Sequence, residues 1–98
     1  MTIKINKKAG RLIMTIAGSL DTTTAPQLEA ALNKSLDGVT ELIFDLKELY
    51  YISSSGLRIL LSALKTMNNK GSMEIRNVNE DVMEVLEITG FSEILTIR

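Results

Sequence analysis

Residues 42–67 read LIFDLKELYYISSSGLRILLSALKTM, and this stretch decides the predicted fold. Residues 42–46 form a short, mostly apolar run, which is the pattern of a strand covered on both faces in a parallel sheet. After Gly56, apolar residues at positions 57, 60, 61, 64 and 67 have the spacing of one helix face. Serines occupy positions 53–55, between the two patterns. The stretch therefore predicts a central strand, a hydroxyl-rich junction and a helix over residues 56–69.

The flanking sequence adds strands and helices in alternation. Alternating apolar residues on both sides of Ala9-Gly10 predict a β-hairpin within residues 3–16. Apolar residues at helical spacing predict helices over 25–37 and 79–89, with Thr24 and Gln27 as a capping box for the first. The short segments Met73-Glu74-Ile75 and Ile94-Leu95-Thr96-Ile97 predict a fourth and a fifth strand. The order β-β-α-β-α-β-α-β predicts an α/β fold, a single domain over residues 1–98 whose five-stranded mixed sheet packs against three to four helices.

The residue types that are missing exclude most enzyme chemistry. The 98 residues contain no cysteine and no histidine, so a thiolate nucleophile, a Ser-His-Asp triad and a His- or Cys-ligated metal site are impossible. Ile52 stands where the nucleophile elbow G-x-S-x-G needs glycine. No glycine-rich phosphate-binding motif is present. We therefore expect a protein that is not an enzyme and uses no cofactor and no metal.

Charge and hydropathy narrow the class of partner and the cellular compartment. The net charge is -1 and the lysines are scattered, so no basic surface for nucleic acid is expected. No apolar run approaches the roughly 18 residues of a membrane span, so no membrane insertion is expected. The chain shows no signal-peptide pattern, and the absence of cysteine fits a reducing compartment. We expect a cytoplasmic location.

The serines at the start of the central helix allow two interpretations. The first turn of a helix has unpaired N–H groups and a partial positive charge, so a hydroxyl there can cap the helix. A phosphate on such a hydroxyl would find hydrogen-bond donors already arranged. The residues alone leave open whether one serine is simply the cap or whether one of them is modified.

This junction resembles the STAS family of anti-sigma factor antagonists, at Ile52-Ser53-Ser54-Ser55-Gly56-Leu57. Many phosphorylated family members carry Asp where Ser53 stands. The resemblance extends over nearly the whole chain, through segments at 17–21, 25–26, 42–46, 71 and 88–91. It implies a STAS fold and a regulatory cycle: the unphosphorylated protein binds an anti-sigma factor that is also a serine kinase. The resemblance further implies that this kinase phosphorylates Ser54 and that a PP2C-type phosphatase restores it.

The expected partner-binding surface surrounds Ser54. It comprises the loop after the hairpin, the serine junction and residues of the central helix that share a face with the serines at i+3 and i+4: Ser19, Asp21, Thr22, Ser53, Ser55, Gly56, Arg58 and Ser62. Arg58 could instead be a solvated helix charge. The alternative function is a constitutive STAS scaffold or a subunit of a sensory or lipid-transport complex, in which the serines only cap the helix. A small-ligand or nucleotide-binding domain is a third possibility.

Overall fold

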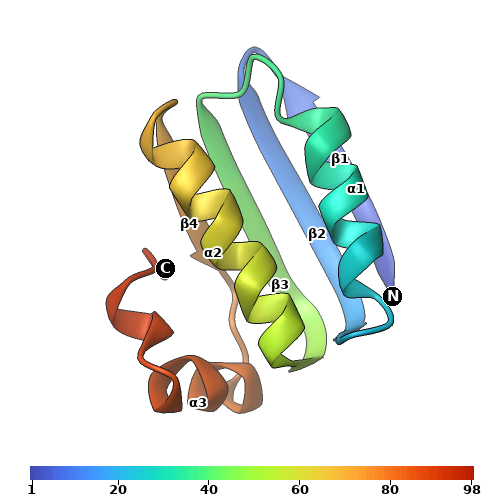
Figure 1. Ribbon diagram of the computed structural model, residues 1–98, viewed down its shortest axis with the longest axis vertical. Helices are drawn as coiled ribbons and strands as arrows, with labels where there is room; N and C mark the ends of the chain where they lie inside the picture. The colour runs from blue at the N-terminus through green and yellow to red at the C-terminus, as the bar shows by residue number, and fades with distance from the viewer.

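The computed structural model describes residues 1–98 and has two layers, a four-stranded sheet and a layer of helices (Figure 1). α1 and α2 lie side by side on one face of the sheet, and α3 lies beyond the end of β3. This arrangement confirms the predicted α/β fold with a mixed sheet. The strands are β1 (Thr2–Lys8), β2 (Arg11–Leu20), β3 (Glu41–Ile52) and β4 (Ser72–Arg76); the helices are α1 (Ala25–Ser35), α2 (Ser54–Asn68) and α3 (Glu80–Ile88), followed by a 3₁₀ turn, η1 (Phe91–Glu93).

The sheet has the order β1-β2-β3-β4, with one antiparallel and two parallel pairs. β1 and β2 form the predicted hairpin, whose turn is made by Ala9 and Gly10 with positive φ angles of 52° and 84°. β3 lies inside the sheet between two parallel neighbours, and each parallel connection contains a helix. Because β2 and β3 are parallel, their carboxyl ends meet at the same edge of the sheet. The loop after β2 and the serine junction after β3 are thereby brought together.

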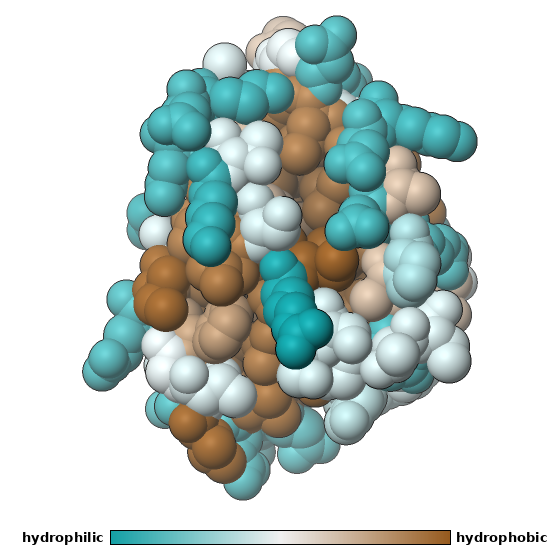
Figure 2. Space-filling model, viewed as in Figure 1, coloured by the Kyte–Doolittle hydropathy of each residue, from teal (hydrophilic) through white to brown (hydrophobic).

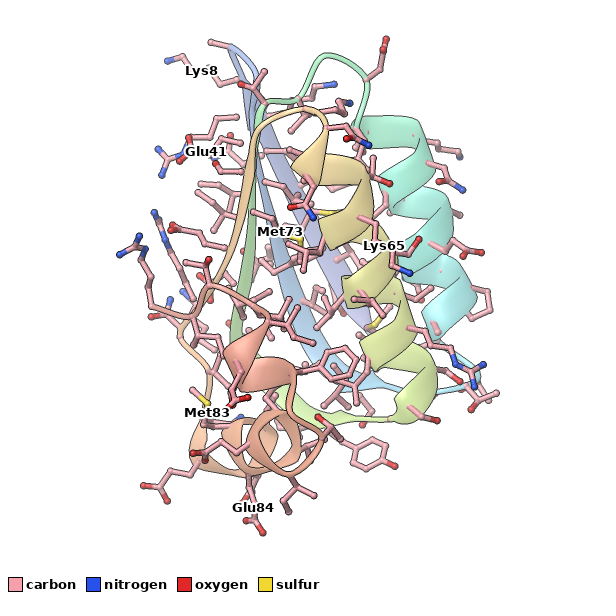
Figure 3. All side chains as sticks on the ribbon, turned by 60° about the vertical axis from the view of Figure 1, so that its left-hand side comes forward. Lys8, Glu41, Lys65, Met73, Met83 and Glu84 are labelled. Carbon is pink, nitrogen blue, oxygen red and sulfur yellow. The ribbon has the colours of Figure 1, made fainter.

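The hydrophobic core lies between the sheet and the helices, and every buried residue in it is apolar. Figure 3 shows Met73 between β4 and α2, whereas Glu41 points away on the opposite face of the sheet. Of the apolar helix face predicted from residue 57 onward, the side chains at 57, 60 and 67 are buried, whereas Leu61 and Leu64 are half-buried. The inward side chains from the two long strands and the two covering helices include Leu12, Met14, Ile16, Leu28, Leu32, Leu42, Phe44, Leu46, Leu57, Leu60 and Met67.

The predicted fifth strand at residues 94–97 is not formed. Gly90, with a φ angle of 81°, turns the chain into η1, and Leu95 is anchored in the core at 6% exposure. Only the last residues then reach the edge of the sheet, where Ile97 makes a single parallel bridge to Ile75. The backbone N–H of Ile75 donates to Thr96 O at 2.8 Å. The sheet therefore has four strands, because the turn and the anchored leucine leave too few residues for a fifth.

The helices agree with their predicted ranges to within two residues at each end. α2 begins at Ser54, two residues before the predicted start, because Ser53 provides the N-cap. The capping box predicted for Thr24 and Gln27 is wrong: the Thr24 hydroxyl donates to Ser19 O at 2.8 Å and makes no cap bond to α1. No helix is both long enough and apolar enough to cross a membrane.

An ion-pair cluster on the open face of the sheet ties the last residue to β4. The Glu74 carboxylate accepts from Arg98 Nε at 2.8 Å and also pairs with Arg76. Partial burial alone would raise the pKa of Glu74, but the hydrogen bonds from Arg98 and Arg76 outweigh it, so its pKa lies below the usual 4.5. The ionised carboxylate is therefore the form that the folded chain favours.

Gly71, between the end of α2 and the start of β4, lies close against the backbone of Thr40. A Cβ at this position would lie 1.9 Å from Thr40 O, an atom that already accepts the N–H of Ser72 at 2.9 Å. Gly71→Ala should therefore lower the free energy of unfolding in urea by roughly 3 kcal/mol, because backbone would have to move. Gly38→Ala is the matched control: its Cβ would meet open space, and the φ angle of 75° should cost only about 1 kcal/mol. Equal losses in the two variants would contradict this account.

The stabilising effect of Glu74 should depend on pH. A carboxyl whose folded-state pKa is depressed contributes stability above its unfolded-state pKa and loses that contribution as the pH falls through its folded-state pKa. Glu74→Gln should therefore be less stable than the wild type at neutral pH, and the two should converge in strongly acidic buffer. Thermal unfolding across this range measures the difference. Glu84→Gln removes an exposed carboxylate without an ion pair and should show no such pH-dependent gap.

Candidate functional site

The carboxyl ends of β2 and β3 bring together the two segments that the sequence singled out. Leu20 and Ile52 are partners across the parallel pair, and the N–H of Ser53 donates to Leu20 O at 2.8 Å. The Thr22 hydroxyl lies 3.2 Å from that of Ser55, so a side-chain bond also joins the loops. The structure therefore places the expected partner-binding residues of the loop after β2 next to those of the serine junction.

The three junction serines have three different environments. Ser53 is the N-cap of α2, and its Oγ accepts the N–H of Gly56 at 3.4 Å. Ser55 is half-buried and is bonded to Thr22. Ser54 is exposed at the first helical position, and its hydroxyl has no hydrogen-bond partner in the chain. Of the three, only Ser54 presents a free hydroxyl to solvent.

Asp21 shapes the loop after β2. Its Oδ1 accepts the Thr23 hydroxyl at 2.7 Å, and the backbone N–H groups of Thr23 and Thr24 at 2.9 and 3.1 Å. The side-chain hydrogen bond from Thr23 is the largest cause that holds the pKa of Asp21 below its usual value, despite the opposing effect of burial. The side chain predicted to contact a partner is therefore engaged in fixing the loop that presents Thr22.

Gly56 allows α2 to start directly on the ends of the two strands. A Cβ at this position would lie 2.7 Å from Leu20 Cγ and 2.9 Å from Ile52 Cγ1. Side chains of any other residue would push the first turn of α2 away from the sheet. Gly56, predicted as a partner-binding residue, is buried and has a packing role in this structure.

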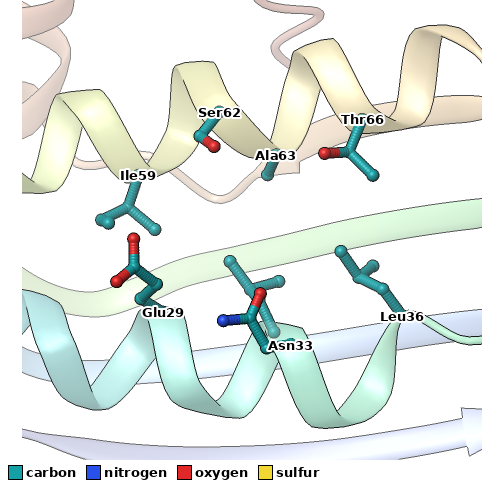
Figure 4. A pocket seen from close by; sticks show the side chains of 8 residues that line it. Glu29, Asn33, Leu36, Ile59, Ser62, Ala63 and Thr66 are labelled. Carbon is teal, nitrogen blue, oxygen red and sulfur yellow. The ribbon is translucent and has the colours of Figure 1, made fainter.

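A groove runs from the serine junction along the line between α1 and α2. Its first part has Thr22, Pro26 and Glu29 on one side and Ser55, Arg58 and Ser62 on the other. Its second part lies between the two helices, with Glu29 and Asn33 of α1 and Leu36 directly after it on one side, and Ile59, Ser62, Ala63 and Thr66 of α2 on the other (Figure 4). Figure 2 shows apolar side chains on the floor of this region between hydrophilic borders.

The groove includes residues that the sequence analysis missed. Pro26 and Glu29 lie in α1 and face the groove only because α1 packs beside α2. Ile59 lies next to Arg58 in the sequence and is half-buried at the α1 side of α2. Ser19 contributes its backbone oxygen to the loop, whereas its side chain makes no hydrogen bond. No group of three or more His, Cys, Asp or Glu side chains could hold a metal ion.

Comparison with known proteins finds a matching domain family and named relatives. A sequence model of the STAS domain matches residues 2–98. A relative from Bordetella bronchiseptica, which bears the name of an anti-sigma factor antagonist, BtrV, is 35% identical over 99% of this chain and 85% of its own length. The Bacillus subtilis anti-sigma-B factor antagonist is 26% identical over 99% of this chain and 90% of its own length.

Solved structures share the fold at low sequence identity. SpoIIAA, an anti-sigma factor antagonist, superposes in its unphosphorylated form with a TM-score of 0.85 at 18% identity, covering 99% of this chain and 88% of the other. Its phosphorylated form, from Bacillus, gives 0.76 at 17% identity, with coverage of 99% and 91%. The match to the STAS domain over residues 2–98, together with the 35% identical relative, shows that this chain belongs to the STAS domain family.

Proposed function

We propose that this protein is an anti-sigma factor antagonist that binds an anti-sigma factor with serine-kinase activity while Ser54 is unmodified, and leaves it once Ser54 is phosphorylated. The observation that carries the proposal is the difference among the three serines. The hydroxyls of Ser53 and Ser55 are engaged within the chain, whereas the exposed hydroxyl of Ser54 is free. A kinase can reach Ser54 without disturbing the cap or the contact with the neighbouring loop.

The start of α2 can carry a phosphate without unfolding. The backbone N–H groups of Ser54 and Ser55 have no partner within the chain, and no acidic residue lies in the first turn of α2. The helix dipole adds a partial positive charge at this end. A phosphoserine there carries a charge of about -1.5 to -2, which these groups and the surrounding water accept. The free protein therefore tolerates the modification.

The same charge opposes a closed interface, because a partner that covers Ser54 must strip water from the phosphate. A penalty of roughly 3 kcal/mol would weaken the complex about a hundredfold. The proposed contact surface consists of Ser54 and the groove beside it, with Thr22 and Ser55 at its near end and Arg58 and Ser62 on α2. Phosphorylation would thus act on binding and leave folding intact.

The relatives support this cycle. BtrV and the Bacillus subtilis relative are named as anti-sigma factor antagonists, and SpoIIAA has been solved in a phosphorylated and an unphosphorylated form. A PP2C-type phosphatase would remove the phosphate and return the protein to its binding state. We propose that the cycle takes place in the cytoplasm, where an anti-sigma factor meets its sigma factor.

Ser54 should be the only serine of the junction that the partner kinase modifies. Incubation with ATP and the anti-sigma-type serine kinase of the same organism should add one phosphate, and peptide mass mapping should place it on Ser54. Ser54→Ala should stay folded and bind the kinase but remain unmodified, whereas Ser54→Asp should fold and bind more weakly. Calorimetric titration measures both affinities.

Ser53→Ala and Ser55→Ala are the matched controls for this experiment. Both should still be phosphorylated, although Ser53→Ala should lose about 1 kcal/mol of stability with the helix cap. Phosphate on residue 53 or 55 would reject the assignment to Ser54. Binding without any phosphate transfer would favour a constitutive scaffold, and no binding at all would reject the proposed function.

Arg58 should contribute to the partner interface because it is exposed and lines the groove one helical turn after Ser54. Arg58→Glu should weaken binding to the kinase by roughly tenfold, or about 1.4 kcal/mol, with unchanged thermal stability. Lys4→Glu makes the same charge reversal on an exposed residue of β1, outside the groove, and should have little effect. Unchanged affinity in Arg58→Glu would make this residue a solvated helix charge.

A further inference from the structure

The segment from Asn77 to Ile97 differs in charge from the rest of the chain. It contains five acidic residues and neither lysine nor arginine, although the whole chain has a net charge of only -1. All five carboxylates are exposed, and none forms an ion pair or a side-chain hydrogen bond within the chain. The five residues are Glu80, Asp81, Glu84, Glu87 and Glu93.

The charge at the carboxyl end of α3 is less favourable for the helix than the charges at the ends of α1 and α2. α1 and α2 each place a lysine in the last turn, Lys34 and Lys65, where a cation interacts favourably with the helix dipole. α3 has no basic residue in its last turn and carries Glu87 there. Glu80 and Asp81 favour the start of α3, but Glu87 opposes its end. Nothing within the chain neutralises this charge.

Two large apolar side chains of the same segment are exposed. Ile88 is 77% exposed at the end of α3, and Ile94 is 53% exposed just after η1. Ile88 follows Glu84 by four residues, so the two share an outward stripe of the helix. Figure 3 shows Glu84 pointing away from the body of the molecule, and Figure 2 shows apolar side chains reaching the surface over this end of the chain. These isoleucines, with Glu84 and Glu87, are called the α3 surface below.

We infer that the α3 surface docks a basic amphipathic helix of a protein partner. Apolar side chains of that helix would cover Ile88 and Ile94, and its lysines or arginines would pair with Glu84 and Glu87. A cation at Glu87 would also complement the carboxyl end of α3. The surplus of negative charge disfavours nucleic acid and anionic lipid as occupants. The inference does not depend on the proposed function, because none of these four residues lines the groove beside Ser54.

The test uses a fluorescein-labelled amphipathic peptide of leucine and lysine, titrated with the full chain and followed by fluorescence anisotropy. The wild type should bind it, and should not bind a peptide in which glutamate replaces lysine. Ile88→Ser and Glu87→Lys should each weaken binding by roughly tenfold. Glu87→Lys should at the same time raise the midpoint of thermal unfolding, because it places a cation at the end of α3. That combination separates a lost contact from a damaged fold.

Two variants elsewhere on the surface provide matched controls. Ile5→Ser removes an exposed isoleucine from β1, and Asp37→Lys reverses an exposed carboxylate of the loop between α1 and β3. That loop lies at the opposite end of the molecule from α3 (Figure 1). Both should bind the leucine–lysine peptide like the wild type. Equal loss in these controls, unchanged affinity in Ile88→Ser and Glu87→Lys, or no binding by the wild type up to about 1 mM would overturn the inference. Self-association of the chain that Ile88→Ser abolishes would also overturn it, because the occupant would then be a second copy.

Discussion

The site depends on how closely the first turn of α2 lies on the ends of β2 and β3. Gly56 makes this approach possible, since a Cβ there would lie within 3 Å of both Leu20 and Ile52 side chains. The parallel pairing of the strand ends joins the N–H of Ser53 to Leu20 O, and Ser53 caps the helix that packs there. Once the cap is fixed, helical geometry turns Ser54 outward and Ser55 toward Thr22. The packing at Gly56 and the cap at Ser53 together set the orientation of the three hydroxyls.

This arrangement separates folding from regulation within three consecutive residues. Ser53 stabilises the start of α2, Ser55 joins the two loops, and Ser54 does neither. Asp21 stiffens the facing loop through bonds to Thr23 and Thr24, so the groove is formed before a partner arrives. A charge added at Ser54 therefore changes the surface that a partner meets, while the contacts that hold the fold remain in place.

The sequence predicted the fold class, the hairpin and the three helices, because their apolar periodicities are strong and local. The sequence analysis also placed the loop after β2 and the serine junction on one expected surface, and the parallel pairing of β2 and β3 is what brings them together. The prediction failed at residues 94–97, where an apolar run resembles a strand but Leu95 is anchored in the core. The roles of Asp21 and Gly56 could not be predicted either, because they depend on contacts with Thr23 and Leu20 that only the folded chain defines. Glu29 and Ile59 were missed because the groove needs both helices in place.

The most direct test of this account compares amide NMR spectra and thermal unfolding of the full chain with and without phosphate on Ser54. The account predicts that shift changes are confined to the start of α2 and the facing loop after β2, and that the unfolding midpoint does not fall. Those results would follow from a phosphate held at an exposed helix end. Shift changes throughout β3 and the core, or a clearly lower midpoint, would contradict it, because the phosphate would then act by disrupting the fold.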